Sequence, residues 1–170
     1  EVLGDEPTAQ RPRRLSVAEQ AKVDEFYEEA RKQGWIEPMP KDDPQYGRHG
    51  INTTVAAKKD AETGKWTDVR ICADSRPPNS ITIRDKRIMP RVDDCMRRIA
   101  GSKYISSLDL RKGFNQIPLA KDSQHLTQFW WKGDLWKWTR MTYGYVNASA
   151  KFQDVMDTEL AQAGLLENTS

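Results

Sequence analysis

The spacing of apolar residues predicts that the first regular element is a helix between Ser16 and Gly34. Ser16 is followed three residues later by Glu19, a capping box in which each side chain satisfies a backbone amide of the other residue. Apolar residues then recur at helical spacing, at Val23, Phe26, Tyr27 and Ala30. Gly34 suits the left-handed position that ends a helix. Residues 1–14 have no such period and predict an extended lead-in.

Two alternating stretches after this helix predict a β-hairpin. Prolines at 38, 40 and 44 first predict a loop. Residues 51–58 are rich in β-branched side chains, and residues 66–73 place Val69, Ile71 and Ala73 on one face and Asp68, Arg70 and Cys72 on the other. The polar residues 60–64 between them are typical of a turn.

The second half of the chain alternates short helices and strands. Residues 90–100 predict a helix that begins at Pro90 and ends at Gly101, with an apolar stripe of Val92, Cys95, Met96 and Ile99. Residues 104–110 predict a strand. Residues 129–138 predict a second hairpin that turns at Gly133-Asp134, with Trp131 paired to Trp136 and Phe129 to Trp138.

A last helix is expected after Asn147, whose side chain could cap it. Its apolar stripe would be Phe152, Val155, Met156 and Leu160. The order of elements has neither the βαβ rhythm of a doubly wound sheet nor the run of strands of a sandwich. The chain is therefore predicted to be an α+β domain.

The composition mainly excludes classes of protein and of site. The chain has 170 residues, 31% of them charged, a mean hydropathy of −0.82 and a net charge of +2. It contains neither an apolar run near 18 residues nor a signal peptide, so we expect no membrane partner and an intracellular protein, cytoplasmic or nuclear. Cys72 and Cys95 lack metal-ligand spacing, which argues against zinc and a disulfide framework.

Charge is distributed unevenly along the chain. Residues 41–103 hold 14 basic and nine acidic residues, whereas residues 1–40 are acidic and residues 104–170 are balanced. A basic middle segment is typical either of a surface that binds an anionic ligand or of a solvated face with long side chains.

Asp109 is the acid that the pattern singles out. It lies between Leu108 and Leu110 at the end of an apolar strand and precedes a glycine turn at Gly113. A carboxylate in this place is either a ligand for a hard cation such as Mg²⁺ or a residue that caps the next turn. Asp93-Asp94 is better explained by the helix dipole, because both residues lie in the first turn of a predicted helix.

Other candidate sites are weak. His49 and His125 have no companion ligand at metal or triad spacing, and no glycine-rich phosphate loop occurs. The aromatic face of the second hairpin could stack nucleic-acid bases, but core packing is the favoured interpretation.

Several segments in one order resemble the reverse transcriptase of gypsy-type LTR retrotransposons, over residues 12–161. Residues 69–79 are similar to the family's Arg-x-Cys-x-Asp-Tyr-Arg-x-x-Asn block, with Ser75 in place of the Tyr. Residues 108–117 are similar to Leu-Asp-Leu-x-x-Gly-Tyr-x-Gln-Ile, the most specific motif present. Residues 141–149 are similar to Met-Pro-Phe-Gly-Leu-x-Asn-Ala-Pro, with both prolines replaced and Tyr145 in place of the Leu.

The resemblance implies a fold, a reaction and a site. The implied fold is the fingers and partial palm of a right-hand polymerase, and the implied reaction is RNA-templated DNA synthesis on a template-primer with dNTPs. Asp109 would be the catalytic residue and a ligand of Mg²⁺. The implied nucleotide-binding residues are Lys58, Arg70, Lys112, Gly113 and Phe114, of which Phe114 would exclude ribonucleotides.

The same resemblance divides the chain into three parts. Residues 1–14 would be an extended segment, residues 15–103 a fingers-like region with the helix and the basic hairpin, and residues 104–170 a partial palm. The family's second acidic motif, Tyr-x-Asp-Asp, does not occur in the 170 residues. We therefore expect no polymerisation by this chain alone. The alternative function is that of a domesticated remnant, a binding or structural subunit whose partial palm is covered by a protein partner.

Overall fold

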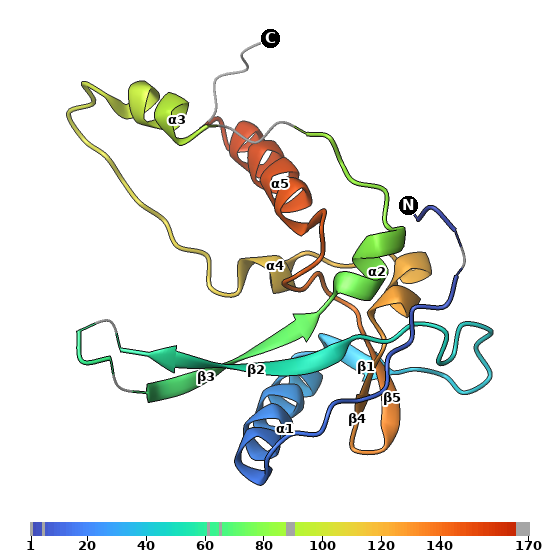
Figure 1. Ribbon diagram of the computed structural model, residues 1–170. Coiled ribbons are helices and arrows are strands. Elements are labelled where there is room, and N and C mark those ends of the chain that lie inside the picture. The colour runs from blue at the N-terminus through green and yellow to red at the C-terminus, as the bar shows by residue number, and fades with distance from the viewer. Residues whose placement is uncertain (1, 5, 61, 65, 88–90, 166–170) are drawn as a thin grey trace.

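The computed structural model describes residues 2–4, 6–60, 62–64, 66–87 and 91–165, apart from the side chains of residues 57–59 and 66–68. A helix, two small sheets and a short 3-10 helix form one body, from which two further helices extend (Figure 1). This arrangement confirms the α+β prediction. Among the described residues, no helix is both long and apolar enough to cross a bilayer.

The first helix, α1, spans Val17–Lys32 and begins as its sequence predicts. The backbone amide of Glu19 donates to Ser16 Oγ at 3.3 Å, and the amide of Ser16 donates to Glu19 Oε2 at 2.8 Å. Gly34 follows the helix with φ of +68°. Both the capping box and the glycine stop are therefore confirmed.

A three-stranded antiparallel sheet packs on α1 in the order β1-β5-β4. Its strands are β1 (Ile36–Pro38), β4 (Phe129–Trp131) and β5 (Asp134–Trp138). The loop predicted from the prolines is wrong at Pro38, which is the last residue of β1. β1 is an edge strand, and there the missing amide of a proline is tolerated.

The turn of the second hairpin differs from the prediction by one residue. Lys132 and Gly133, both with positive φ, form the turn instead of Gly133-Asp134. Phe129 therefore pairs with Trp136, and Trp131 pairs with Asp134. The error arose because a lysine rarely adopts a left-handed conformation, and no local pattern indicated that Lys132 would do so.

The predicted aromatic cluster nevertheless forms the core. Tyr27 of α1 stacks on Phe129 with ring centroids 4.4 Å apart. Trp131 and Trp138 pack against the Tyr27 ring, and Trp138 also packs against Phe129. Phe129, Trp131 and Trp138 are buried, and Trp136 is half-buried. The core-packing interpretation is confirmed, because three of the four rings have no exposed face on which a base could stack.

The first hairpin is also confirmed. β2 (Asn52–Lys59) pairs with β3 (Trp66–Asp74) in antiparallel register, and the pair forms the long arm at the left of Figure 1. Val55, Ile71 and Ala73 pack against the aromatic core, so the opposite face, with Arg70 and Cys72, points away from it. A short helix, α2 (Arg76–Ile81), follows β3.

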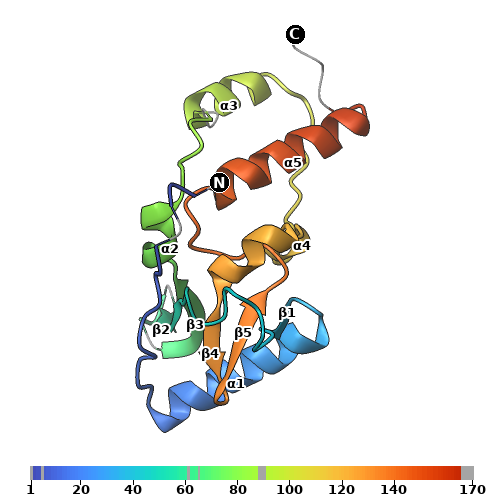
Figure 2. The same cartoon turned by 90° about the vertical axis from the view of Figure 1, so that its right-hand side faces the viewer.

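The remaining helices are α3 (Val92–Ile99), α4 (Gly113–Gln116), the 3-10 helix η1 (Lys121–Thr127) and α5 (Ala148–Gln162). In both views α3 and α5 lie beyond α4, on the side away from α1 (Figure 2). α3 forms as predicted, with its acids in the first turn and its arginines in the last. Pro90 lies outside the described residues.

Two predictions in this region are wrong. Residues 104–110 are extended but form no strand, because strand hydrogen bonds need a neighbouring strand and the described residues provide none. Asn147 precedes α5 without capping it. Its side chain instead accepts from the amide of Asp85 and donates to the carbonyl of Ile83, which ties the chain after α2 to the start of α5.

Candidate functional site

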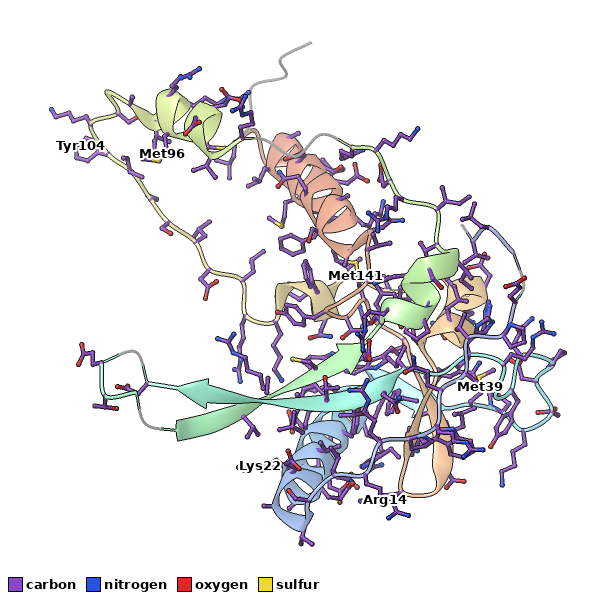
Figure 3. All side chains as sticks on the ribbon, viewed as in Figure 1. Arg14, Lys22, Met39, Met96, Tyr104 and Met141 are labelled. Carbon is purple, nitrogen blue, oxygen red and sulfur yellow. The ribbon has the colours of Figure 1, made fainter. Side chains whose placement is uncertain are left out.

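Two cavities that share Tyr143 contain most of the residues singled out from the sequence. The larger, of about 700 Å³, is lined by Arg70 of β3, Lys112, Tyr143 and a face of α1. Figure 3 labels Lys22, which belongs to that face. The smaller, of about 460 Å³, is lined by residues 108–110, Gly113, Phe114, Tyr143 and the apolar stripe of α5. Positions far apart in sequence therefore converge around one aromatic residue.

The β2–β3 hairpin contains two of the basic residues singled out from the sequence, Lys58 and Arg70. Ala56 lies opposite Arg70, and Lys58 lies opposite Asp68, so Lys58 and Arg70 are two steps apart on the same side of the ladder. Arg70 is exposed and lines the larger cavity. The side chain of Lys58 lies outside the described residues.

The turn between residues 110 and 113 is fixed by two unusual features. Lys112 has a left-handed backbone with φ of 50° and ψ of 44°. A Cβ on Gly113 would lie 2.9 Å from Phe152 Cε2, so any larger residue would force the Phe152 ring of α5 to shift. The backbone of this turn is therefore held at the junction of the two cavities.

Phe114 belongs to an aromatic cluster at the smaller cavity. Its ring centroid lies 4.8 Å from that of Tyr143 and 5.2 Å from that of Phe152, in tilted and edge-to-face arrangements. These contacts restrict the rotation of Phe114. The side chain is half-buried, so one part packs while another part remains at the cavity surface.

Two asparagines that sequence reasoning gave no role hold the segment with Tyr143. Asn79 donates to the carbonyl of Gly144 at 2.8 Å and accepts from the amide of Val146 at 2.9 Å. Asn115 is buried and donates to the carbonyl of Met141 at 3.1 Å. Both asparagines lie within the motifs quoted above, and an amide's ability to donate and accept was the available signal.

Asp74, at the end of β3, is paired with two arginines. Its carboxylate accepts from Arg76 Nε at 2.7 Å and Nη2 at 2.6 Å, and from Arg13 Nη2 at 3.0 Å. The hydrogen bonds of Arg76 hold the pKa of Asp74 below its usual value. Because Arg13 belongs to the extended N-terminal segment, Asp74 fastens that segment to the end of β3.

Asp109 supplies a single exposed carboxylate at the edge of the smaller cavity. Across the described ranges, no group of three or more His, Cys, Asp or Glu side chains is placed to hold a metal ion. One carboxylate is therefore a partial donor set for a hard cation, which takes about six oxygen ligands.

Comparison with known proteins identifies the family. Residues 57–164 match the family described as "Reverse transcriptase (RNA-dependent DNA polymerase)". The retrovirus-related Pol polyprotein from transposon 297 of Drosophila melanogaster is 34% identical over 108 residues, 64% of this chain and 10% of that protein. The polyprotein from transposon gypsy of the same organism is 29% identical over 119 residues, 70% of this chain and 12% of that protein. The chain thus spans about a tenth of the length of these relatives.

The fold agrees with this assignment. The foamy viral protease-reverse transcriptase in complex with an RNA/DNA hybrid matches 95% of this chain and 20% of its own, with a TM-score of 0.78 and 22% identity. The same viral enzyme in complex with dsDNA matches 89% of this chain and 27% of its own, with a TM-score of 0.63 and 28% identity. The resemblance inferred from the motifs is confirmed, and the chain belongs to the reverse transcriptase (RNA-dependent DNA polymerase) family.

Proposed function

We propose that this chain is the dNTP-binding fingers and partial palm of a retrotransposon reverse transcriptase. The observation that carries the proposal is the convergence of Arg70, Lys112 and Tyr143 on one cavity, beside a second cavity lined by Asp109, Gly113 and Phe114. This places cations, an aromatic ring and a carboxylate around one junction. A deoxynucleoside triphosphate presents the complementary groups, which are phosphates, a sugar and a bound metal ion.

In this proposal, the triphosphate lies in the larger cavity. The Arg70 guanidinium binds phosphate oxygens through two parallel hydrogen bonds, and Lys112 contributes a second positive charge. Lys58, two steps from Arg70 along the hairpin ladder, is proposed as a third cation from the same side. The backbone amides at Lys112 and Gly113 donate to the same phosphates.

Asp109 is proposed as the catalytic residue and as one ligand of Mg²⁺. The remaining oxygen ligands would come from substrate phosphates and from carboxylates outside residues 1–170, such as a Tyr-x-Asp-Asp motif. When bound, the metal would activate the primer 3′-hydroxyl and stabilise the leaving pyrophosphate. Asp109 would hold the metal beside the sugar-binding end of the site.

Phe114 is proposed to select deoxyribose. Its ring packs against Tyr143 and Phe152, and these contacts disfavour the displacement that an additional hydroxyl group at the sugar 2′ position would require. The expected consequence is weaker binding of ribonucleotides through steric exclusion.

The proposed organisation is a fingers-like region over residues 15–103 and a partial palm over residues 104–170, which together bind template-primer. Apolar side chains on α3 and along residues 104–110 are exposed. Their exposure supports the proposal that further palm strands, from a longer chain or a partner, cover this face.

Nucleotide binding by the 170-residue chain tests the proposal. We expect dTTP with Mg²⁺ to bind measurably by calorimetry, and Arg70→Gln to weaken binding about tenfold or more, because a charged hydrogen bond to phosphate is lost. Phe114→Ala should bring the affinities for dTTP and its ribonucleotide closer together.

Arg98→Gln is the matched control, because it removes the same charge from α3, which does not line either cavity. Equal binding by Arg70→Gln and Arg98→Gln would contradict the proposed site. Absence of dTTP binding by the unaltered chain, with its fold intact, would favour the structural-subunit alternative.

A further inference from the structure

Lys112 and Lys132 share an unusual arrangement. Within the described part of the chain, they are the two non-glycine residues with positive φ, at 50° and 51°. Each ammonium group lies over a tryptophan ring: Lys112 Nζ is 4.7 Å from the centroid of Trp35, and Lys132 Nζ is 4.8 Å from that of Trp131. Both distances are within the range of a cation–π interaction.

The two lysines differ in charge compensation. Lys132 Nζ also donates to Glu28 Oε1 at 2.8 Å, so its charge is paired at the hairpin turn. Among the residues that the structure describes, no carboxylate forms an ion pair with Lys112. A ring holds a cation without neutralising it, so Lys112 keeps its charge and its N–H donors for another anion.

Trp35 is a rigid support for this contact. Its amide donates to the carbonyl of Ala30 at 2.9 Å, and its carbonyl accepts from the amide of Thr139 at 2.8 Å. Its ring packs against the buried aromatic core. Trp35 is therefore held by hydrogen bonds to α1 on one side and to the segment after β5 on the other.

The carboxylates that line the same cavity as Lys112 have other partners. Glu25 and Glu29 of α1 line the same cavity, but Glu25 pairs with Lys22 at 3.3 Å and Glu29 accepts from Gln33 at 3.0 Å. Lys112 lines both this cavity and another of about 100 Å³. Lys112 is also exposed, so an anion that enters the larger cavity lies beside this residue.

We propose that Trp35 is a positioning residue that holds the Lys112 ammonium, uncompensated, at the cavity for the polyphosphate of a nucleotide. The inference rests on the proposed function. A free lysine loses considerable side-chain entropy when it binds an anion. The Trp35 ring imposes much of this order before the ligand arrives, so binding is stronger than with a free Lys112.

The contact itself can be read by NMR. Lysines are reductively methylated with ¹³C, which retains their charge, and the Lys112 signal is assigned by its loss in Lys112→Arg. We expect the ring current of Trp35 to shift this signal upfield, and Trp35→Leu and Trp35→Met to abolish the shift. The Lys132 signal over Trp131 should stay unchanged in both variants, which shows that the fold is intact. An unchanged Lys112 signal in the variants would overturn the proposal.

The binding role is measured on unmethylated protein. We expect Trp35→Leu and Trp35→Met to weaken dTTP binding about twofold to fivefold, the range of a partly exposed cation–π contact, and Trp35→Phe to restore most of it. Equal affinity in all variants would overturn the positioning role.

A further titration distinguishes failure of the proposed function from failure of the role proposed for Trp35. If the unaltered chain does not bind dTTP, inorganic triphosphate is titrated while the Lys112 signal is followed. A response in the unaltered chain that Trp35→Leu loses would support an anion site held by Trp35, although the nucleotide proposal had failed. No response in the unaltered chain would overturn both.

Discussion

The body around α1 and the region of α3 and α5 have similar apolar patterns and opposite outcomes. Phe129, in the β4 strand of the body, has no exposed surface, whereas Leu108, in the segment predicted as a strand, is 85% exposed. The stripe of α1 packs on two sheets, but α3 has no buried residue. Figure 3 shows Met96 and Tyr104 at the far end of this region, away from the body.

The difference shows that an amphipathic pattern specifies a face, while its burial depends on a partner. In the body, the partners are α1 and the β4–β5 hairpin, which lie about 100 residues apart in the sequence. In the other region, α5 contacts Gly113 and Phe114 through Phe152 and leaves much of its stripe half-exposed. An exposed apolar surface of this kind is typical of an interaction site.

The largest expected loss of stability, and the strongest test of this comparison, is in the core. Phe129→Ala should lower the free energy of unfolding by about 3–5 kcal/mol, because it removes a fully buried ring and leaves a cavity. Leu108→Ala is the control and should change it by less than about 0.5 kcal/mol. Urea unfolding followed by tryptophan fluorescence measures both. Similar losses for the two variants would show that Leu108 is buried in solution.

A smaller effect is expected at Asp74, whose side chain is 6% exposed. Asp74→Asn should cost about 2 kcal/mol, since charged hydrogen bonds to Arg13 and Arg76 are weakened. The pKa of Asp74 is lowered in the folded state, so its stabilisation is full above the unfolded pKa of about 4 and is lost as pH falls through the folded pKa.

When unfolding is measured from pH 7 to pH 2, the free energies of unfolding of the unaltered chain and of Asp74→Asn should therefore converge in acid. Asp154→Asn is the matched control from α5, because Asp154 is also paired with two cations, Arg87 and Lys151, but is more exposed. Its effect should be clearly smaller, because solvent screens the pairs. A pH-independent difference for Asp74→Asn would contradict the electrostatic explanation.

The smallest of the three expected losses of stability is at the start of α1. Ser16→Ala should lower stability by about 1 kcal/mol, because the capping box of α1 is lost. Val17→Ala, at a position that is 90% exposed, is the control and should be nearly neutral. Thermal unfolding and amide exchange in the first turn of α1 measure the loss. Equal exchange in both variants would mean that packing alone defines this end.

Sequence patterns predicted the elements that depend on near neighbours. The capping box, the helical stripe of α1 and the β2–β3 alternation all act over a few residues, and all three are confirmed. The turn at Lys132 was missed because an unfavourable local conformation is imposed by the aromatic pairs on either side. The predicted strand over residues 104–110 failed because a strand is completed by hydrogen bonds to another segment.

The candidate site divides in the same way. The resemblance of residues 108–117 to one short family motif implied roles for Asp109, Gly113 and Phe114 together, because they lie within six residues of one another. Spacing could not show that Arg70 and Lys112, 42 positions apart, line one cavity with Tyr143. Nor could it show that Asn79 holds the Tyr143 segment or that Trp35 lies under Lys112.

The sequence by itself therefore determined the family, the helices with their caps, the alternating strands and the short motif at Asp109. The tertiary structure decided the hairpin register, which apolar stripes are covered and which distant side chains meet. The physical reason is range: caps and periodicity act through the chain within one or two turns, whereas burial, strand pairing and a shared cavity require contacts between segments that only folding brings together.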